Sequence, residues 1–365
     1  MMRDALTAIL QNRFNLLLVA APASWVLDRA LPGSPWIFLT AAISLVPLAG
    51  IIGLATEQLA LRAGPAVGGL LNATFGNAAE LIIALVALGR GHVALVKASI
   101  TGSIVGNLLL VLGLAFLVGG LGRRSQTFNR TAATNAAALL FLAVVALVVP
   151  AVFDLTLYGT LTARPPAIFR LSLCSAFVLI FAYCGNLLYA FRVHRDLFRS
   201  EREADEQPWL TTAAALTLLG GATILTTIQA EVLVGALQPA LVQFGLTELF
   251  VGVIVIAIVG NAAEHYSALV AARRDQMTLA VEIAVGSSAQ IALLVGPIIV
   301  LYSFAIGKPI TLVLNPFEIA AITLSVLATV IVVVDGESNW VEGLQLLSVY
   351  VILALAFYFV PATAG

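Results

Sequence analysis

Two glutamates occur in identical local surroundings in this sequence. The run Gly-Asn-Ala-Ala-Glu stands at 76–80 and again at 260–264, so Asn77 and Glu80 recur 184 residues later as Asn261 and Glu264. On a helix, an asparagine and a glutamate three residues apart share one face. A carboxylate beside an amide oxygen binds a metal cation or a proton, so the sequence offers two copies of one such site.

The free-energy cost of burying a charged carboxylate limits the states in which these two glutamates can exist. Both lie deep within apolar runs, where an ionised side chain in a membrane costs roughly 3 kcal/mol. No Lys or Arg lies near the middle of the neighbouring runs, which argues against a buried salt bridge. Each glutamate is then either protonated or bound to a cation. A transporter that exchanges cations for protons uses both states.

The apolar run after each motif supplies further oxygen atoms. Ser103 and Asn107 follow the first motif, and Ser287, Ser288 and Gln290 follow the second. Carboxylate, amide and hydroxyl oxygens are hard ligands that suit Ca²⁺ better than a soft metal. Hydrogen bonding between helices is the alternative role for these side chains. His265 follows Glu264 directly and is either a proton carrier or a hydrogen-bonded side chain.

Each motif also begins with a glycine, Gly76 or Gly260. Because glycine has no Cβ, it lets the backbone bend or lets a second helix approach closely. A bend would expose a backbone carbonyl, whereas a close approach would pack two helices together.

The composition places these motifs in a membrane. The chain has 365 residues, of which 61% are hydrophobic and 10% are charged, whereas soluble domains are about a quarter charged. The net charge of −1 argues against a nucleic-acid partner. Cys174 and Cys184 fall in one expected helix, roughly 15 Å apart, too far for a disulfide.

We expect an all-α membrane protein with eleven transmembrane helices, because most of the apolar runs exceed the roughly 20 residues that cross a bilayer. The expected helices are 14–30, 36–61, 66–90, 93–119, 131–152, 168–192, 210–238, 247–272, 278–305, 315–334 and 342–361. The first of them also has features of a signal peptide, and we favour a retained helix.

The two motifs belong to a longer internal repeat. Residues 71–113 and 255–297 are identical at 17 of 43 positions without a gap, including Gly102/Gly286 and Ser103/Ser287. Each copy has five helices, an odd number, so the second copy enters the membrane from the opposite side. This predicts an inverted-topology 5+5 repeat with the substrate between the halves near the midplane.

The repeat divides the chain. We expect a peripheral helix in 1–33, a first five-helix repeat in 34–191, a polar linker in 192–208 and a second repeat in 209–365. Alternate loops carry twelve and six Lys or Arg residues. The more basic side faces the cytoplasm, which places the N-terminus and the linker there.

The sequence resembles the H⁺/Ca²⁺ exchanger branch of the calcium/cation antiporter superfamily. The stretches that carry the resemblance are ATEQLALRAGPAVGGLLNATFGNAAELI at 55–82, GSIVGNLLLVLG at 102–113, VGNAAEH at 259–265 and GSSAQIALLVG at 286–296. The resemblance covers essentially the whole chain.

The resemblance implies roles for named residues. Glu80 and Glu264 would be the pair that binds Ca²⁺ and exchanges protons, with Asn107, Ser287, Ser288 and Gln290 in the same pocket. Glu57 and Glu231 would lie on gating helices that slide against the core. Family members often carry further acidic residues around 231–238, where this chain has EVLVGALQ.

These observations favour a Ca²⁺/H⁺ antiporter in the cytoplasmic membrane of a prokaryote. The transported ions, membrane lipid and protons are its expected partners, no cofactor is expected, and the sequence does not predict an oligomeric state. The same fold coupled to Na⁺ or carrying Mn²⁺ is the alternative. An intramembrane metalloenzyme is disfavoured because no His-x-x-x-His or comparable catalytic cluster occurs, and a passive channel suits the repeat less well.

Overall fold

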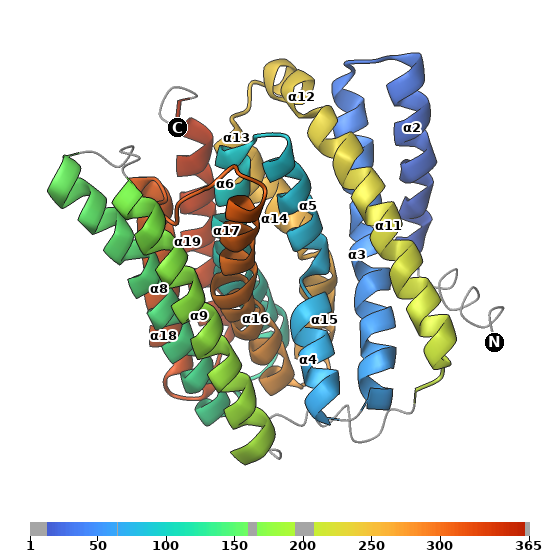
Figure 1. Ribbon diagram of the computed structural model, residues 1–365. Helices are drawn as coiled ribbons and strands as arrows, with labels where there is room; N and C mark the ends of the chain where they lie inside the picture. Colours follow the sequence, from blue (N-terminus) through green and yellow to red (C-terminus); the bar gives the residue numbers. More distant parts are fainter. Residues whose placement is uncertain (1–12, 64, 160–165, 194–207, 362–365) are drawn as a thin grey trace.

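The computed structural model describes residues 13–63, 65–159, 166–193 and 208–361, and the chain is helical through most of them (Figure 1). The helices are η1 (Arg13–Val19), α2 (Ala20–Ala30), α3 (Pro35–Ala63), α4 (Pro65–Phe75), α5 (Ala78–Gly89), α6 (Val93–Val105), η2 (Gly106–Val111), α7 (Leu112–Gly120), α8 (Arg130–Tyr158), α9 (Pro166–Val193), α11 (Thr212–Gly235), α12 (Leu237–Phe244), α13 (Glu248–Phe250), η3 (Val251–Ile256), α14 (Ala257–Gly260), α15 (Ala262–Arg273), α16 (Met277–Gln290), η4 (Ile291–Val295), α17 (Gly296–Ala305), α18 (Pro316–Val333) and α19 (Trp340–Phe359).

Among the described residues, eight continuous helical stretches are long and apolar enough to cross a membrane. A ninth would be the pair Leu237–Phe244 and Glu248–Gly260, which is bent by 109°. The protein is therefore a multi-pass membrane protein. Three of the eleven expected helices are shorter or broken, namely 14–30, which begins as a 3₁₀ turn, 66–90 and 247–272. Eleven crossings remain a prediction, and most of the 192–208 linker lies outside the described residues.

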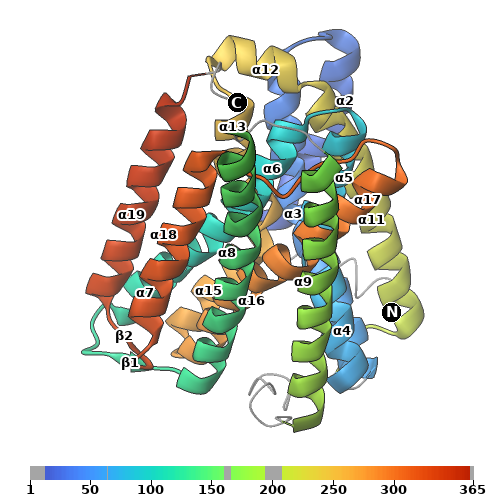
Figure 2. The same ribbon diagram turned by 60° about the vertical axis from the view of Figure 1, so that its left-hand side comes forward.

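Helices α2, α3 and α11 form a panel along one side of the protein (Figure 1). Ser24 of α2 donates to the Gln229 Oε1 atom of α11 across 3.0 Å, which ties the panel together internally. Helices α8, α9, α18 and α19 lie on the other side, and α5, α6, α15 and α16 lie between (Figure 2). The motif helices are therefore in the interior of the protein.

The two ends of the bundle differ. We call the end with turns 31–34, 90–92 and 236–247 the α12 end, and the end with turns 121–129, 274–276 and 334–339 the β end, because the two-residue strands β1 (Gln126–Thr127) and β2 (Glu337–Ser338) pair there (Figure 2). The strands were not expected from the sequence.

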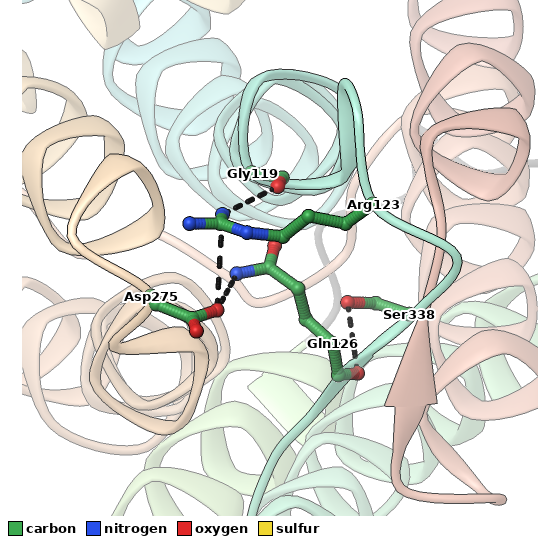
Figure 3. Close-up of polar contacts among 5 residues, drawn as sticks. All are labelled: Gly119, Arg123, Gln126, Asp275 and Ser338. Atoms are coloured by element: carbon green, nitrogen blue, oxygen red, sulfur yellow. Dashed lines mark hydrogen bonds and ion pairs between the residues drawn. The ribbon is translucent and has the colours of Figure 1, made fainter.

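Polar contacts fasten the loops of the β end (Figure 3). Gln126 donates to the Asp275 Oδ1 atom across 2.5 Å, and the Arg123 Nη1 atom lies 3.7 Å from the same oxygen. Ser338 donates to the backbone oxygen of Gln126. These residues come from the turns α7–α8, α15–α16 and α18–α19. The contacts therefore hold together three turns outside the α2–α3–α11 panel, the part of the protein that we call the core.

Candidate cation-binding site

Both motif helices are broken at the asparagine, where the sequence predicted continuous helices. Asn77 is the N-cap residue of α5 and Asn261 that of α15, with nearly equal backbone angles of φ −98°, ψ 27° and φ −92°, ψ 16°. Glu80 and Glu264 therefore stand at the third position of their helices rather than along a continuous helical face. The positive end of a helix dipole favours a negative charge at such a position.

The Glu80 side chain is buried, with 8% of its surface exposed. Neither of its carboxylate oxygens has a hydrogen-bond partner among the described residues. Gly260 of the other motif lies against this side chain, since a Cβ atom at that position would be 2.9 Å from Glu80 Cγ. The glycine thus allows the close approach that the sequence suggested.

Glu264 lies four residues after Gly260, which packs against the Glu80 side chain. The Glu264 side chain is partly buried. Among the described ion pairs, none includes either glutamate. Two like charges in an apolar interior disfavour joint ionisation, so bound protons or a bound cation would stabilise the pair.

The asparagines link the two motifs to the helices that follow them. Asn107 donates to the Asn261 Oδ1 atom across 3.0 Å, and Asn261 donates to Ser103 Oγ across 2.8 Å. Asn77 donates to Gln290 Oε1 across 2.6 Å. Each bond joins one copy of the repeat to the other. The carbonyl oxygens of Asn77 and Asn107 stay buried without a hydrogen-bond partner among the described residues.

The helix crossing that brings Ser103 to Asn261 depends on small residues. A Cβ atom at Gly102 of α6 would overlap the backbone of Val253 in η3, and one at Gly252 would overlap Ala98. The two helices therefore pack backbone to backbone. A cavity beside this crossing is lined by Glu80, Ser99 and Ser103 together with apolar side chains.

The two serines of the second copy, Ser287 and Ser288, do not hydrogen-bond to the site asparagines in the described contacts. The Ser288 hydroxyl donates to the backbone oxygens of Ala284, across 3.0 Å, and of Ile104, across 3.4 Å. It therefore acts in helix packing in this structure. Ser287 is partly exposed on α16. The structure thus brings Asn77, Glu80, Ser103, Asn107, Asn261 and Gln290 together, with Glu264 nearby.

Two π-helical segments adjoin these oxygen atoms. Asn107 lies in η2, and η4 begins directly after Gln290. A π-helical turn is uncommon and frequently marks a functional site. The two segments occupy matching positions in the two copies of the sequence repeat.

The residues expected on the gating helices are exposed, Glu57 on α3 and Glu231 near the end of α11. His265 is partly buried and follows Glu264 on α15. Glu231 forms an ion pair with Arg90 at the end of α5. Sequence reasoning missed this partner, and it also missed Ser99, which lies four residues before Ser103 and so on the same face of α6.

Within the described residues, no group of three or more His, Cys, Asp or Glu side chains could hold a metal ion. The oxygen atoms gathered here come from two carboxylates, several amides and a hydroxyl. Such a set suits a hard cation, and its position inside a membrane bundle is typical of a transport protein.

The comparisons identify the family. A profile of the sodium/calcium exchanger protein family matches residues 33–192 and 214–359. The chain belongs to this family, and this confirms the resemblance seen in the sequence.

Named relatives match over nearly the whole chain. A Ca²⁺/H⁺ antiporter of Synechocystis is 42% identical, with 95% of this chain and 97% of the relative covered. The Ca²⁺/H⁺ antiporter ChaA of Bacillus subtilis is 41% identical, with 95% and 99% covered. The solved structure of native YfkE superposes with a TM-score of 0.82 at 38% identity, over 95% of this chain and 99% of that one. Family members are transporters rather than enzymes.

Proposed function

We propose that this protein exchanges Ca²⁺ for H⁺ across a prokaryotic cytoplasmic membrane. The observation that carries the proposal is a set of buried acceptor oxygens that have no hydrogen-bond donor among the described residues, namely both Glu80 carboxylate oxygens and the carbonyl oxygens of Asn77 and Asn107. A buried acceptor without a partner is costly, so the site favours a bound proton or a bound cation. The names of the relatives support Ca²⁺ as that cation.

The mechanism follows from competition between the two ions. Ca²⁺ needs ionised carboxylates, whereas protons neutralise Glu80 and Glu264, so one ion displaces the other. The loaded site and the protonated site are each close to neutral. The empty site carries two negative charges and opposes passage through the low-dielectric barrier. Exchange without leak follows from this difference.

Alternating access would come from the inverted repeat. The breaks at Asn77 and Asn261 and the segments η2 and η4 recur at matching positions of the two copies, which supports two structurally equivalent halves. Discontinuous helices at the substrate site are typical of such transporters, and the backbone carbonyls that a break exposes can coordinate a cation. We assign the sliding gate to α3 and α11, which carry Glu57 and Glu231, and we place the β end in the cytoplasm.

Flux into everted membrane vesicles tests this function. ⁴⁵Ca²⁺ uptake should require an inwardly acidic pH gradient, collapse with a protonophore and proceed without Na⁺. Vesicles with the Glu80→Gln variant are the control. Uptake that ignores the pH gradient, or that needs Na⁺, would refute Ca²⁺/H⁺ exchange.

A further inference from the structure

The ion pair between Arg90 and Glu231 joins the helix panel to the core. Arg90 is the C-cap residue of α5, and its Nε atom donates to the Glu231 Oε2 atom of α11 across 2.8 Å. The Nη2 atom contacts the same oxygen. The guanidinium lies over Gly235, where a Cβ atom would be 3.3 Å from Nη1. The pair therefore lies across the α5–α11 contact at the α12 end.

The C-cap arginine has a counterpart in the second copy of the repeat. Adding 184 to 90 gives Arg274, the C-cap residue of α15. The backbone angles agree, with φ −85°, ψ −2° at Arg90 and φ −84°, ψ 10° at Arg274. Each backbone N–H bonds to the carbonyl four residues earlier, in Val86 and Val270 respectively. Arg274 is exposed at the β end.

The glutamate also has a counterpart, because α3 and α11 align with an offset of 174 residues. At this offset Glu231 matches Glu57, and Ala215, Leu219 and Leu233 match Ala41, Leu45 and Leu59. Burial follows the same register: the matched pairs 48/222, 52/226, 55/229 and 56/230 are also buried in both helices, whereas both glutamates are exposed. The motifs repeat at an offset of 184 residues, ten more than these two helices. The second copy is longer between its first helix and its motif because it contains α12 and the turns beside it, which the first copy lacks.

Helix direction places the second pair at the opposite end of the bundle. Helix α3 runs toward the β end, so Glu57, six residues before its last residue, lies toward the same end of the bundle as the turn that holds Arg274. Helices α3 and α15 are in contact, as α11 and α5 are at the α12 end (Figure 1). Among the described residues, the Arg274 side chain makes no ion pair or hydrogen bond.

We propose that Arg90–Glu231 and Arg274–Glu57 are alternating latches, the first closing the α12 end in the conformation seen here and the second closing the β end in the opposite conformation. The inference rests on the proposed alternating access and adds two positioning residues, Arg90 and Arg274. Each pair stabilises one state, so loss of either shifts the equilibrium toward the other.

A cysteine reporter measures this shift. Val234 is 2% exposed and directly precedes Gly235, against which the Arg90 side chain of α5 packs, so we expect it to become accessible when α11 parts from α5. The Val234→Cys variant is made in the full chain with Cys174→Ser and Cys184→Ser, since both native cysteines are exposed. The rate of labelling by a membrane-impermeant maleimide, applied from the α12 end, reports opening.

Charge reversal at Arg90 and at Arg274 should change the labelling rate of the cysteine reporter in opposite directions. Breaking an exposed ion pair and replacing it by repulsion should change the labelling rate about threefold to tenfold. Arg90→Glu and Glu231→Arg should each raise the rate, and Arg274→Glu should lower it. The double variant Arg90→Glu/Glu231→Arg should restore the original rate. Arg90→Lys keeps the charge of an exposed ion pair and should stay within about twofold of that rate.

The ion pair Arg123–Asp275 supplies a matched control, because it has the same chemistry but joins core loops only (Figure 3). Arg123→Glu should leave the labelling rate unchanged. The proposal is overturned if Arg90→Glu and Arg274→Glu shift the rate in the same direction, if the charge swap does not restore it, or if Arg123→Glu has an equal effect.

The labelling assay needs neither Ca²⁺ nor a pH gradient, so it separates this proposal from the proposed function. The expected labelling pattern without proton-coupled Ca²⁺ flux would refute Ca²⁺/H⁺ exchange and leave the latches standing. Proton-coupled flux without that pattern would refute the latches alone.

Discussion

Replacing either site glutamate by glutamine should abolish exchange and leave the fold intact. Glu80→Gln keeps the side-chain volume and removes the charge. Neither oxygen of Glu80 accepts a hydrogen bond from a described residue, so the substitution breaks no hydrogen bond within the described part of the chain. We expect the free energy of unfolding to change by less than about 1 kcal/mol.

The loss of cation affinity should be much larger. An interaction with a charged group contributes about 1.5–3 kcal/mol, and Ca²⁺ would lose one such contact. Apparent affinity should then fall roughly 10- to 150-fold. Exchange should fall further, because glutamine cannot carry a proton. The same reasoning applies to Glu264→Gln.

Asp154 provides a matched control for this experiment. Its carboxylate, on α8 and outside the site, is fully buried, and neither oxygen has a partner among the described residues. Asp154→Asn therefore makes the same chemical change at a carboxylate outside the site. Ca²⁺ flux in proteoliposomes and monodispersity in detergent are measured side by side. Substantial exchange in Glu80→Gln, or equal loss in Asp154→Asn, would refute the two-glutamate mechanism.

Two further predictions concern the neighbours of the carboxylates. Asn107→Ala and Gln290→Ala should weaken apparent Ca²⁺ affinity roughly 5- to 10-fold while transport survives, whereas Ser288→Ala should have little effect; unchanged affinity in the first two would make them packing residues only. Gly260→Ala should weaken affinity roughly fivefold, because the added Cβ atom displaces the Glu80 side chain at a cost of about 1 kcal/mol. Gly286→Ala, whose Cβ atom would meet nothing within 4 Å, is the control, and equal effects would contradict the proposed contact.

The sequence predicted the helices well, because long apolar runs admit few alternatives inside a membrane. The expected ranges 36–61, 93–119 and 315–334 agree with α3, the stretch from α6 to α7, and α18 to within a few residues. The breaks at Asn77 and Asn261 were missed because the apolar pattern continues through them. The preceding glycines were the available signal.

The partners within the site could be predicted only in part. The duplicated motif identified the glutamates and asparagines as one group. The bond between Asn77 and Gln290 joins residues 213 positions apart in the sequence, and no local pattern specifies which amide accepts from which. Ser288 shows the converse, since its place in a motif suggested a ligand while its hydroxyl donates to its own helix.

The pairing of Arg90 with Glu231 could not be predicted from the sequence. Glu231 was expected on a gating helix, and Arg90 was one of the basic residues in the loops. They come from different copies of the repeat and meet only because α11 packs on α5. The repeat nevertheless allows one observed contact to predict a second one. Once one pair is seen, the duplication identifies its counterpart at the other end, where a transporter that opens on both sides needs one. A duplicated sequence thus allows one conformation to predict contacts of another.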